Sequence, residues 1–217
     1  MRVAAAFALA LAAYGAQLST ATTSSGLKEA LSLATERAVQ ATSKPGGFLD
    51  NPQIRIKLPG KLDAMANGLR ALGMGAQVNE LDESMNHAAE KAAGEATPVF
   101  VDAIKGMTFE DAAAILKGND TAATSYFKKK TSAPLTAKFR PIVEDAMKNV
   151  GVTQQYDALV SHYASTPFGS APKLDLTGYV TDQTLAGLFT VVADEEKRIR
   201  KDPAARATDL LKQVFGH

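Results

Sequence analysis

The sequence contains no cysteine and no tryptophan, and only three histidines among its 217 residues. Without cysteine the chain forms no disulfide, offers no thiol nucleophile and has no residue to receive a lipid at a signal cleavage point. Neither sign of charge dominates, because 24 lysines and arginines stand against 23 aspartates and glutamates, for a formal net charge of +1. A global electrostatic attraction to nucleic acid is therefore not expected, and partners must be argued from local features.

The first residues have the pattern of an export signal. Arg2 precedes an uncharged apolar run over residues 3–16, and small residues follow at 19–21 with the spacing that a signal peptidase reads. The run is too short to span a bilayer, which needs about 20 apolar residues. We therefore expect residues 1–21 to be a cleaved signal peptide, a periplasmic or secreted location, and no transmembrane segment in the mature chain. The alternative is a buried, alanine-rich N-terminal helix.

Apolar residues recur at helical spacing along most of the remaining chain. The pattern predicts one mostly α-helical domain over residues 26–216, a compact multi-helix bundle without repeats or linkers. The expected helices cover residues 27–43, 62–72, 78–92, 98–104, 108–117, 120–131, 132–150, 153–163 and 181–201, with a last helix after 202. Pro141 is expected to kink or split its helix.

Several helix boundaries carry local signals. Thr108 followed three residues later by Asp111 predicts a capping box, and Gly118 predicts the end of that helix. Asp120 is expected to cap the next helix, and Thr181 or the residue after it to cap the helix that ends near 201.

One short segment has the pattern of a strand instead. Ile54, Ile56 and Leu58 alternate with the basic residues Arg55 and Lys57, as in a strand with one covered face. Residues 173–176 are the best candidate partner. A small two-stranded β-ribbon on the helical body is therefore a further expectation.

Eight pieces of the sequence together carry a family resemblance. They are GLKEAL from Gly26, FLDNPQIRIKLPGKL from Phe48, MNHAAEKAA from Met85, MTFEDAAAILKGNDTAATSYFKKKT from Met107, FRPIVEDAM from Phe139, GVTQQY from Gly151, YVTDQTLAGLF from Tyr179 and DPAARATDLLKQVFG from Asp202. The chain resembles the exported bacterial proteins of the domain of unknown function 4197 (DUF4197) family. The resemblance implies an exported bacterial helical domain and supplies no catalytic residues. His87 departs from it, since the family has Arg after Met-Asn.

Metal chemistry has one weak candidate, a polar face on the helix over 78–92. Glu83, His87 and Glu90 lie at i, i+4 and i+7, with Asn86 beside them. A solvated face with a Glu83–His87 pair is the favoured interpretation, because no HExxH motif is present. No metal and no cofactor are expected.

Nucleophilic catalysis has little support in the sequence. Ser170 lies in a tight Gly-Ser-Ala-Pro turn but lacks the glycine pattern and the strand-to-helix turn of a nucleophile elbow. Glu195 and Glu196 are interpreted as part of a solvated helix face. No catalytic residue is assigned.

The basic cluster is the candidate surface patch. It comprises Lys128, Lys129, Lys138 and Arg140, which could meet phospholipid headgroups or an acidic partner. The favoured interpretation is simpler: the lysines end a helical turn in solvent while Phe127 packs in the core.

Two classes of function remain. A non-catalytic binding module of the cell envelope would hold a small apolar or amphipathic ligand in a cleft between its alanine- and methionine-rich helices. A protein-interaction or structural module would use an exposed helical face against an envelope protein or a second copy. A hydrolase is a distant third. Empty space inside the bundle would favour the first class over the second.

Overall fold

The computed structural model describes residues 20–149, 151–166, 174–205 and 212. These residues form eight α-helices and no strand. The α-helices are α1 Thr20–Ser43, α2 Asp63–Ala71, α3 Gly75–Ala93, α4 Thr97–Lys105, α5 Phe109–Lys117, α6 Ala122–Asn149, α7 Val152–Ala164 and α8 Leu176–Lys201. Short 3₁₀ helices cover Gly60–Leu62, Gly94–Ala96 and Pro203–Ala205. The predicted mostly helical, multi-helix fold is confirmed.

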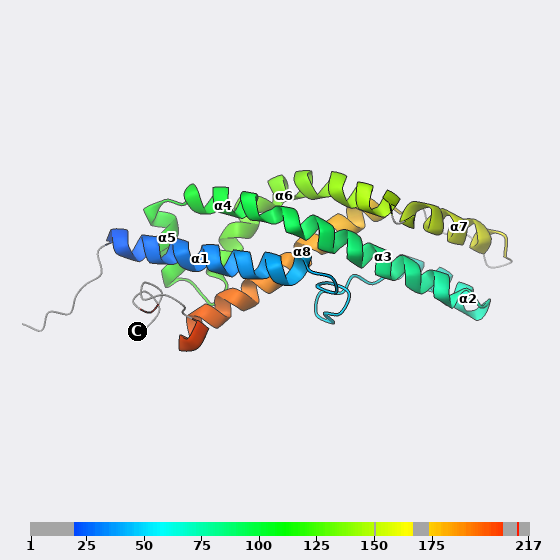
Figure 1. The fold of residues 1–217 in the computed structure, drawn as a ribbon, viewed down its shortest axis with the longest axis horizontal. Coiled ribbons are helices and arrows are strands. Elements are labelled where there is room, and N and C mark those ends of the chain that lie inside the picture. The colour runs from blue at the N-terminus through cyan, green and yellow to red at the C-terminus, as the bar shows by residue number, and fades with distance from the viewer. Residues whose placement is uncertain (1–19, 150, 167–173, 206–211, 213–217) are drawn as a thin grey trace, which may run out of the picture.

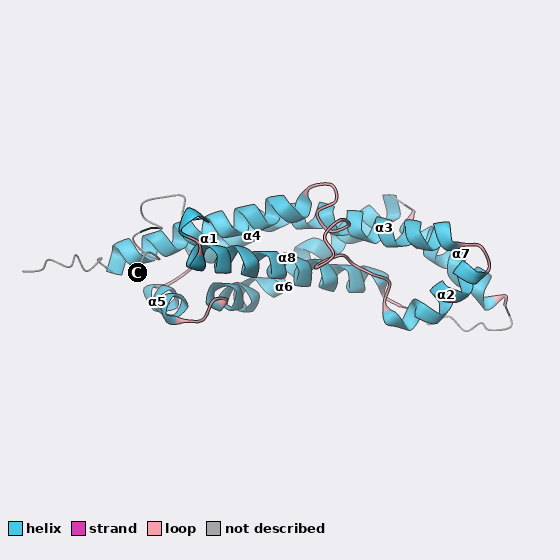
Figure 2. Ribbon diagram, turned by 90° about the horizontal axis from the view of Figure 1, so that it is seen from below, coloured by secondary structure: helices cyan, strands magenta, loops and turns pink. Residues whose placement is uncertain are grey.

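The molecule is elongated, and α8 runs obliquely across α1 and α3 (Figure 1). α8 packs against α1, α3 and α6, and α3 also packs against α6. α2 and α7 pack together and cover the start of α3 at one end, while α4 and α5 lie at the other end (Figures 1 and 2). None of the described helices combines the length and the apolar character needed to cross a bilayer.

The interior is filled by aromatic rings and small residues. The Phe100 ring meets those of Phe127 and Phe189 edge-on, at centroid distances of 5.4 and 6.2 Å. The ring of Phe48 fills a notch at Gly187, where an added Cβ would come within 2.5 Å of it. Glycine is therefore needed at 187 for close packing.

α6 is one helix where the sequence predicted two. Residues 120–131 and 132–150 were expected to be separate, but α6 runs unbroken through Pro134 and Pro141. Phe127, Leu135 and Phe139 form a continuous buried stripe across the expected break. Burial of that stripe outweighs the one backbone hydrogen bond that each proline removes.

The cap predictions had mixed outcomes. The capping box at α5 is confirmed, with hydrogen bonds of 3.1 and 3.2 Å between Thr108 and Asp111. α8 begins earlier than expected, because Asp175 rather than Thr181 accepts from the first turn, at 2.8 Å from the Gly178 nitrogen. Thr181 instead donates its hydroxyl back to the Thr177 carbonyl.

Asp120 does not cap α6. Its carboxylate pairs with Lys201 at the end of α8, and that hydrogen bond lowers the pKa of Asp120. Asn119 accepts from the Thr121 nitrogen at 3.0 Å instead. The cap prediction failed because a partner distant in sequence competes for the side chain.

The two-stranded ribbon is absent from the described residues. Within the described part of the chain, residues 55–59 pair with no other strand and form no strand themselves. Leu174 and Asp175 directly precede α8. Lys173 and Ser170 lie outside the described residues. So do residues 1–19 of the expected signal peptide, whereas Thr20 and Ala21 belong to α1.

Candidate binding site

Three polar side chains on one face of α3 hold the extended segment in place. Asp82, Asn86 and Glu90 lie at i, i+4 and i+8, so that they project from successive turns. Each contacts the chain between Phe48 and Ile56. We call residues 48–60 the strapped segment, because side chains of α3, in addition to local turn hydrogen bonds, hold its backbone in place of a neighbouring strand.

Asn86 occupies the place of a missing strand. Its Oδ1 accepts from the Ile56 nitrogen and its Nδ2 donates to the Ile56 carbonyl, both at 2.8 Å. The side chain is fully buried, and its second N–H is bound by the Asp82 carbonyl. A buried amide with its hydrogen bonds satisfied fixes one backbone position strongly.

Glu90 and Asp82 bind the strapped segment before Ile56. The buried Glu90 carboxylate accepts from the backbone nitrogens of Phe48 and Leu49, at 3.1 and 3.2 Å. Arg55 donates to the Asp82 carboxylate through Nη2 at 2.6 Å and Nε at 3.3 Å. Arg55 also donates through Nη1 to the Leu49 carbonyl, which folds the segment back on itself.

The strapped segment borders a hollow against α2 and α3, which we call the basic hollow. It has a volume of about 460 Å³ and is lined by Arg55, Lys57, Leu58, Gly60, Asp63, Ala66, Arg70 and Asp82. Tyr179 donates to the Lys57 carbonyl at 2.9 Å. Burial raises the pKa of Tyr179, and the nearby charges of Asp82 and Asp63 raise it further.

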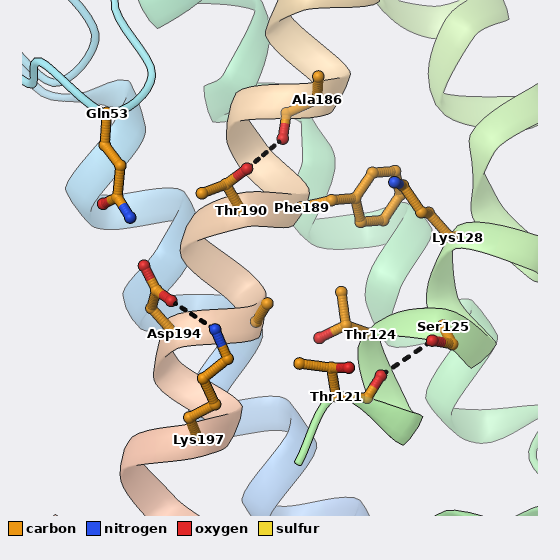
Figure 3. Close-up of a pocket in the computed structure, with 11 residues that line it drawn as sticks. Gln53, Thr121, Thr124, Ser125, Lys128, Ala186, Phe189, Thr190, Asp194 and Lys197 are labelled. Atoms are coloured by element: carbon orange, nitrogen blue, oxygen red, sulfur yellow. Dashed lines mark hydrogen bonds and ion pairs between the residues drawn. The ribbon is translucent and has the colours of Figure 1, made fainter. Parts of the chain in front are cut away.

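A polar groove of about 360 Å³ lies between the start of α6 and the middle of α8, with Gln53 at its edge (Figure 3). Many of its polar groups already have partners. Lys197 pairs with Asp194 at 3.2 Å. The hydroxyls of Ser125 and Thr190 donate to the backbone carbonyls of Thr121 and Ala186. These commitments leave the groove few free donors for a ligand.

An apolar groove of about 300 Å³ lies between α4 and α6. Its lining residues are Val99, Asp102, Ala103, Gly106, Tyr126, Lys130, Thr131 and Pro134. Pro134 has no N–H, so it cannot donate to the Lys130 carbonyl one turn earlier. Tyr126 contacts Asp111 through its hydroxyl at 3.4 Å, and burial, with the Asp111 charge second, raises the pKa of Tyr126.

The bundle interior offers much less room than these surface grooves. The apolar space between α1 and α8, lined by Leu27, Leu31 and Ile199 among others, measures only about 10 Å³. A volume of this size is at the lower limit of what holds a single water molecule, about 10 to 15 Å³. A ligand of drug size therefore has room in the apolar groove and not in this interior space.

The structure does not bring the predicted basic cluster together. Lys128 and Lys129 are exposed on α6, but Lys138 lies about 15 Å further along the helix axis. Lys138 pairs with Glu95 at 3.6 Å, and Arg140 pairs with Asp175 at 2.9 Å. The prediction that Phe127 is buried beside exposed lysines is confirmed.

The predicted polar face of α3 is divided between core and solvent. Asn86 and Glu90 are buried, whereas Glu83 and His87 are exposed. His87 pairs through Nδ1 with Glu90 at 3.0 Å rather than with Glu83. Among the residues that the structure describes, no three His, Asp or Glu side chains are grouped to hold a metal ion.

Sequence reasoning missed the strap and the basic hollow. The available signal was the spacing of Asp82, Asn86 and Glu90 on one helix, together with an extended segment that lacked a clear partner. It also misplaced Glu196, which was interpreted as solvated but is only 4% exposed and turns toward the start of α6. Its neighbour Glu195 pairs with Arg37 and Arg198.

Comparison with known proteins gives a family but no characterised relative. No curated protein and no solved structure matches the chain significantly. A family model with the description "Protein of unknown function (DUF4197)" matches residues 17–216, nearly the whole chain. The chain therefore belongs to the DUF4197 family.

Proposed function

We propose that this protein is a non-catalytic binding module of the cell envelope that holds an apolar or amphipathic ligand in the apolar groove. The observation that carries the proposal is the apolar groove between α4 and α6, which is open at the surface. The volume of this groove, about 300 Å³, is at the lower end of the range for small-molecule sites. The apolar space between α1 and α8 is too small for such a ligand and does not add support.

The groove has an apolar wall and a polar rim. Val99, Ala103 and Pro134 offer carbon surface to the ligand's apolar part. The ammonium of Lys130 lies 5.8 Å from the centre of the Tyr126 ring, where it is placed to meet an anionic head group.

The hydroxyls in the groove favour binding over catalysis. Thr131 donates its hydroxyl to the Phe127 carbonyl at 2.7 Å, so it is part of the helix backbone network. Tyr126 is engaged with Asp111 and carries a raised pKa, which opposes formation of a phenolate. A catalytic nucleophile requires the opposite, a lowered pKa or an adjacent activating base.

A filled-groove variant tests the proposal. Ala103→Phe places a ring in the groove, and Ala137→Phe, at an exposed α6 position outside the groove, is the matched control. Titration of a fluorescent fatty acid should show saturable binding that Ala103→Phe weakens by about tenfold or more while the control does not, since filling the groove removes about 2 kcal/mol of apolar contact. Equal binding by both variants would contradict the proposed groove.

Self-association is the second candidate, favoured by one observation. Phe109 is 54% exposed at the start of α5, three residues after Gly106 of the apolar groove. An exposed large aromatic side chain is a typical protein-contact feature. Sedimentation velocity over a range of concentrations distinguishes the two functions: association that Phe109→Ser abolishes would support the interaction module.

Export to the periplasm or the medium is also proposed. Its support is the charged start, apolar run and small residues of positions 1–21. In N-terminal sequencing, the protein from its native host should begin between residues 16 and 22. An intact Met1 on a cytosolic protein would contradict export.

A further inference from the structure

We propose that the basic hollow is a second binding site, for a small organic anion that carries a phosphate group. This site is separate from the apolar groove, because the basic hollow is formed by the strapped segment, α2 and α3. The apolar groove is formed by α4 and α6. The proposal is therefore independent of the proposed function.

Two of the three basic side chains that line the hollow are not in an ion pair with any described residue. Among its lining residues, Arg55 is paired with Asp82. Lys57 and Arg70 have no ion-pair partner among the residues that the structure describes. Asp63 is the opposing charge, but it is the first residue of α2, where the helix dipole offsets a carboxylate.

Hydrogen bonds hold the backbone that carries Arg55 and Lys57. Ile56 is fixed on both backbone groups by Asn86, and the Lys57 carbonyl is fixed by Tyr179. Arg55, which also lines the hollow, is held by Asp82 and by the Leu49 carbonyl. A ligand therefore does not have to order the loop as it binds, and the associated entropy cost is small.

The size and lining indicate the class of anion. A volume of about 460 Å³ exceeds what an inorganic ion needs, and Leu58 and Ala66 offer carbon surface for an organic part. A guanidinium suits the oxygens of a phosphate, and an ammonium adds a second positive charge. The geometry thus favours a doubly charged phosphate monoester with a small apolar substituent over a single carboxylate.

Calorimetric titration with phenyl phosphate is the direct test. The Lys57→Gln/Arg70→Gln variant removes the two cations that have no ion-pair partner among the described residues. Lys61→Gln removes an exposed charge of the neighbouring 3₁₀ helix that does not line the hollow. We expect saturable one-to-one binding, weakened at least about tenfold in the double variant and unchanged in Lys61→Gln. Matching thermal midpoints of the three proteins will show that the double variant is folded.

A second measurement identifies the source of the phosphate. Vesicles containing phosphatidic acid are compared with neutral vesicles for the same three proteins. If the wild type binds the phosphatidic acid vesicles and the double variant does not, the natural ligand is a lipid headgroup. If the wild type binds phenyl phosphate but not these vesicles, the natural ligand is a free phosphate monoester. The proposal is overturned if neither probe binds, or if the double variant and Lys61→Gln bind equally. Ala103→Phe should leave both measurements unchanged, which separates this site from the apolar groove.

Discussion

The carboxylate of Glu196 accepts two hydrogen bonds from Thr124, one from the backbone nitrogen and one from the hydroxyl, both at 2.8 Å. Its other oxygen accepts from the Ala123 nitrogen at 2.9 Å. A side chain of α8 thus supplies the cap of α6. Arg200 completes the network by donating to Glu196 and, through Nη2, to the Ile115 carbonyl of α5.

Removing Glu196 should destabilise the fold severely. Glu196→Ala leaves two N–H groups of α6 without their acceptor and the Arg200 guanidinium without its carboxylate, at an expected cost of about 3 to 5 kcal/mol. Urea denaturation measures the change. Asp194→Ala, at a half-exposed position two residues earlier that pairs with Lys197 of the same helix turn, should cost under about 0.5 kcal/mol. Similar midpoints for the two variants would show that the cap is not needed.

Asn86→Leu should release the strapped segment. The side chain keeps its approximate volume but leaves both backbone groups of Ile56 without a partner, for an expected loss of about 1 to 3 kcal/mol. Hydrogen exchange at the Ile56 amide should accelerate more than global unfolding explains. Asn79→Leu, at an exposed position of the same helix, is the control and should leave that amide unchanged. Unaltered exchange in Asn86→Leu would contradict the strap.

Phe127→Ala should destabilise the protein by about 3 to 5 kcal/mol, because the ring is fully buried and packs against Phe100. Lys129→Ala, exposed two residues later, should cost under about 0.5 kcal/mol. Chemical denaturation of both variants tests the orientation of α6. Equal midpoints would mean that the helix face has been wrongly assigned.

Asp175 should contribute to acid sensitivity. Its pKa lies below the ordinary 3.8, first because the Gly178 nitrogen donates to it and then because Arg140 lies beside it. A lowered pKa in the folded state stabilises the protein above pH 3.8, and this contribution is lost as the pH falls further. Asp175→Asn keeps a capping side chain but removes the titration. Its stability should therefore fall less between pH 5 and pH 2 than that of the wild type, and parallel curves would contradict the assignment.

The lysines of α6 should not form a membrane-binding patch. Lys138 and Arg140 are paired with acids, and Lys128 and Lys129 stand apart from them. Lys128→Gln/Lys129→Gln should therefore leave binding to anionic vesicles unchanged. If the double variant instead lost about 1 kcal/mol of vesicle binding per charge, and added salt weakened wild-type binding in the same way, a lipid surface would be a partner there.

The sequence predicted what depends on neighbours along the chain. The α5 capping box is an example, because Thr108 and Asp111 need only each other. The helical stripe that buries Phe127 is another. Both are set by helix geometry, which a sequence shows directly.

The missed features depend on partners far away in sequence. Glu196 caps a helix that begins more than 70 residues earlier, and its neighbour Glu195 has the same local pattern but another role. The strand prediction found the correct alternation at Ile54 and Ile56, yet the partner was a side chain of α3 rather than a second strand. Which distant group satisfies a backbone N–H follows only from the packing of the helices.

The Asn86 side chain also sets the register of the strapped segment. Ile54 and Ile56 face the core, while Arg55 and Lys57 face solvent. A slip of one residue would exchange these sets and turn charged side chains into the apolar interior, which is strongly unfavourable. Asn86 binds both backbone groups of Ile56 and therefore selects one alignment of the strapped segment against α3. In a β-sheet the register is set instead by a whole ladder of backbone hydrogen bonds.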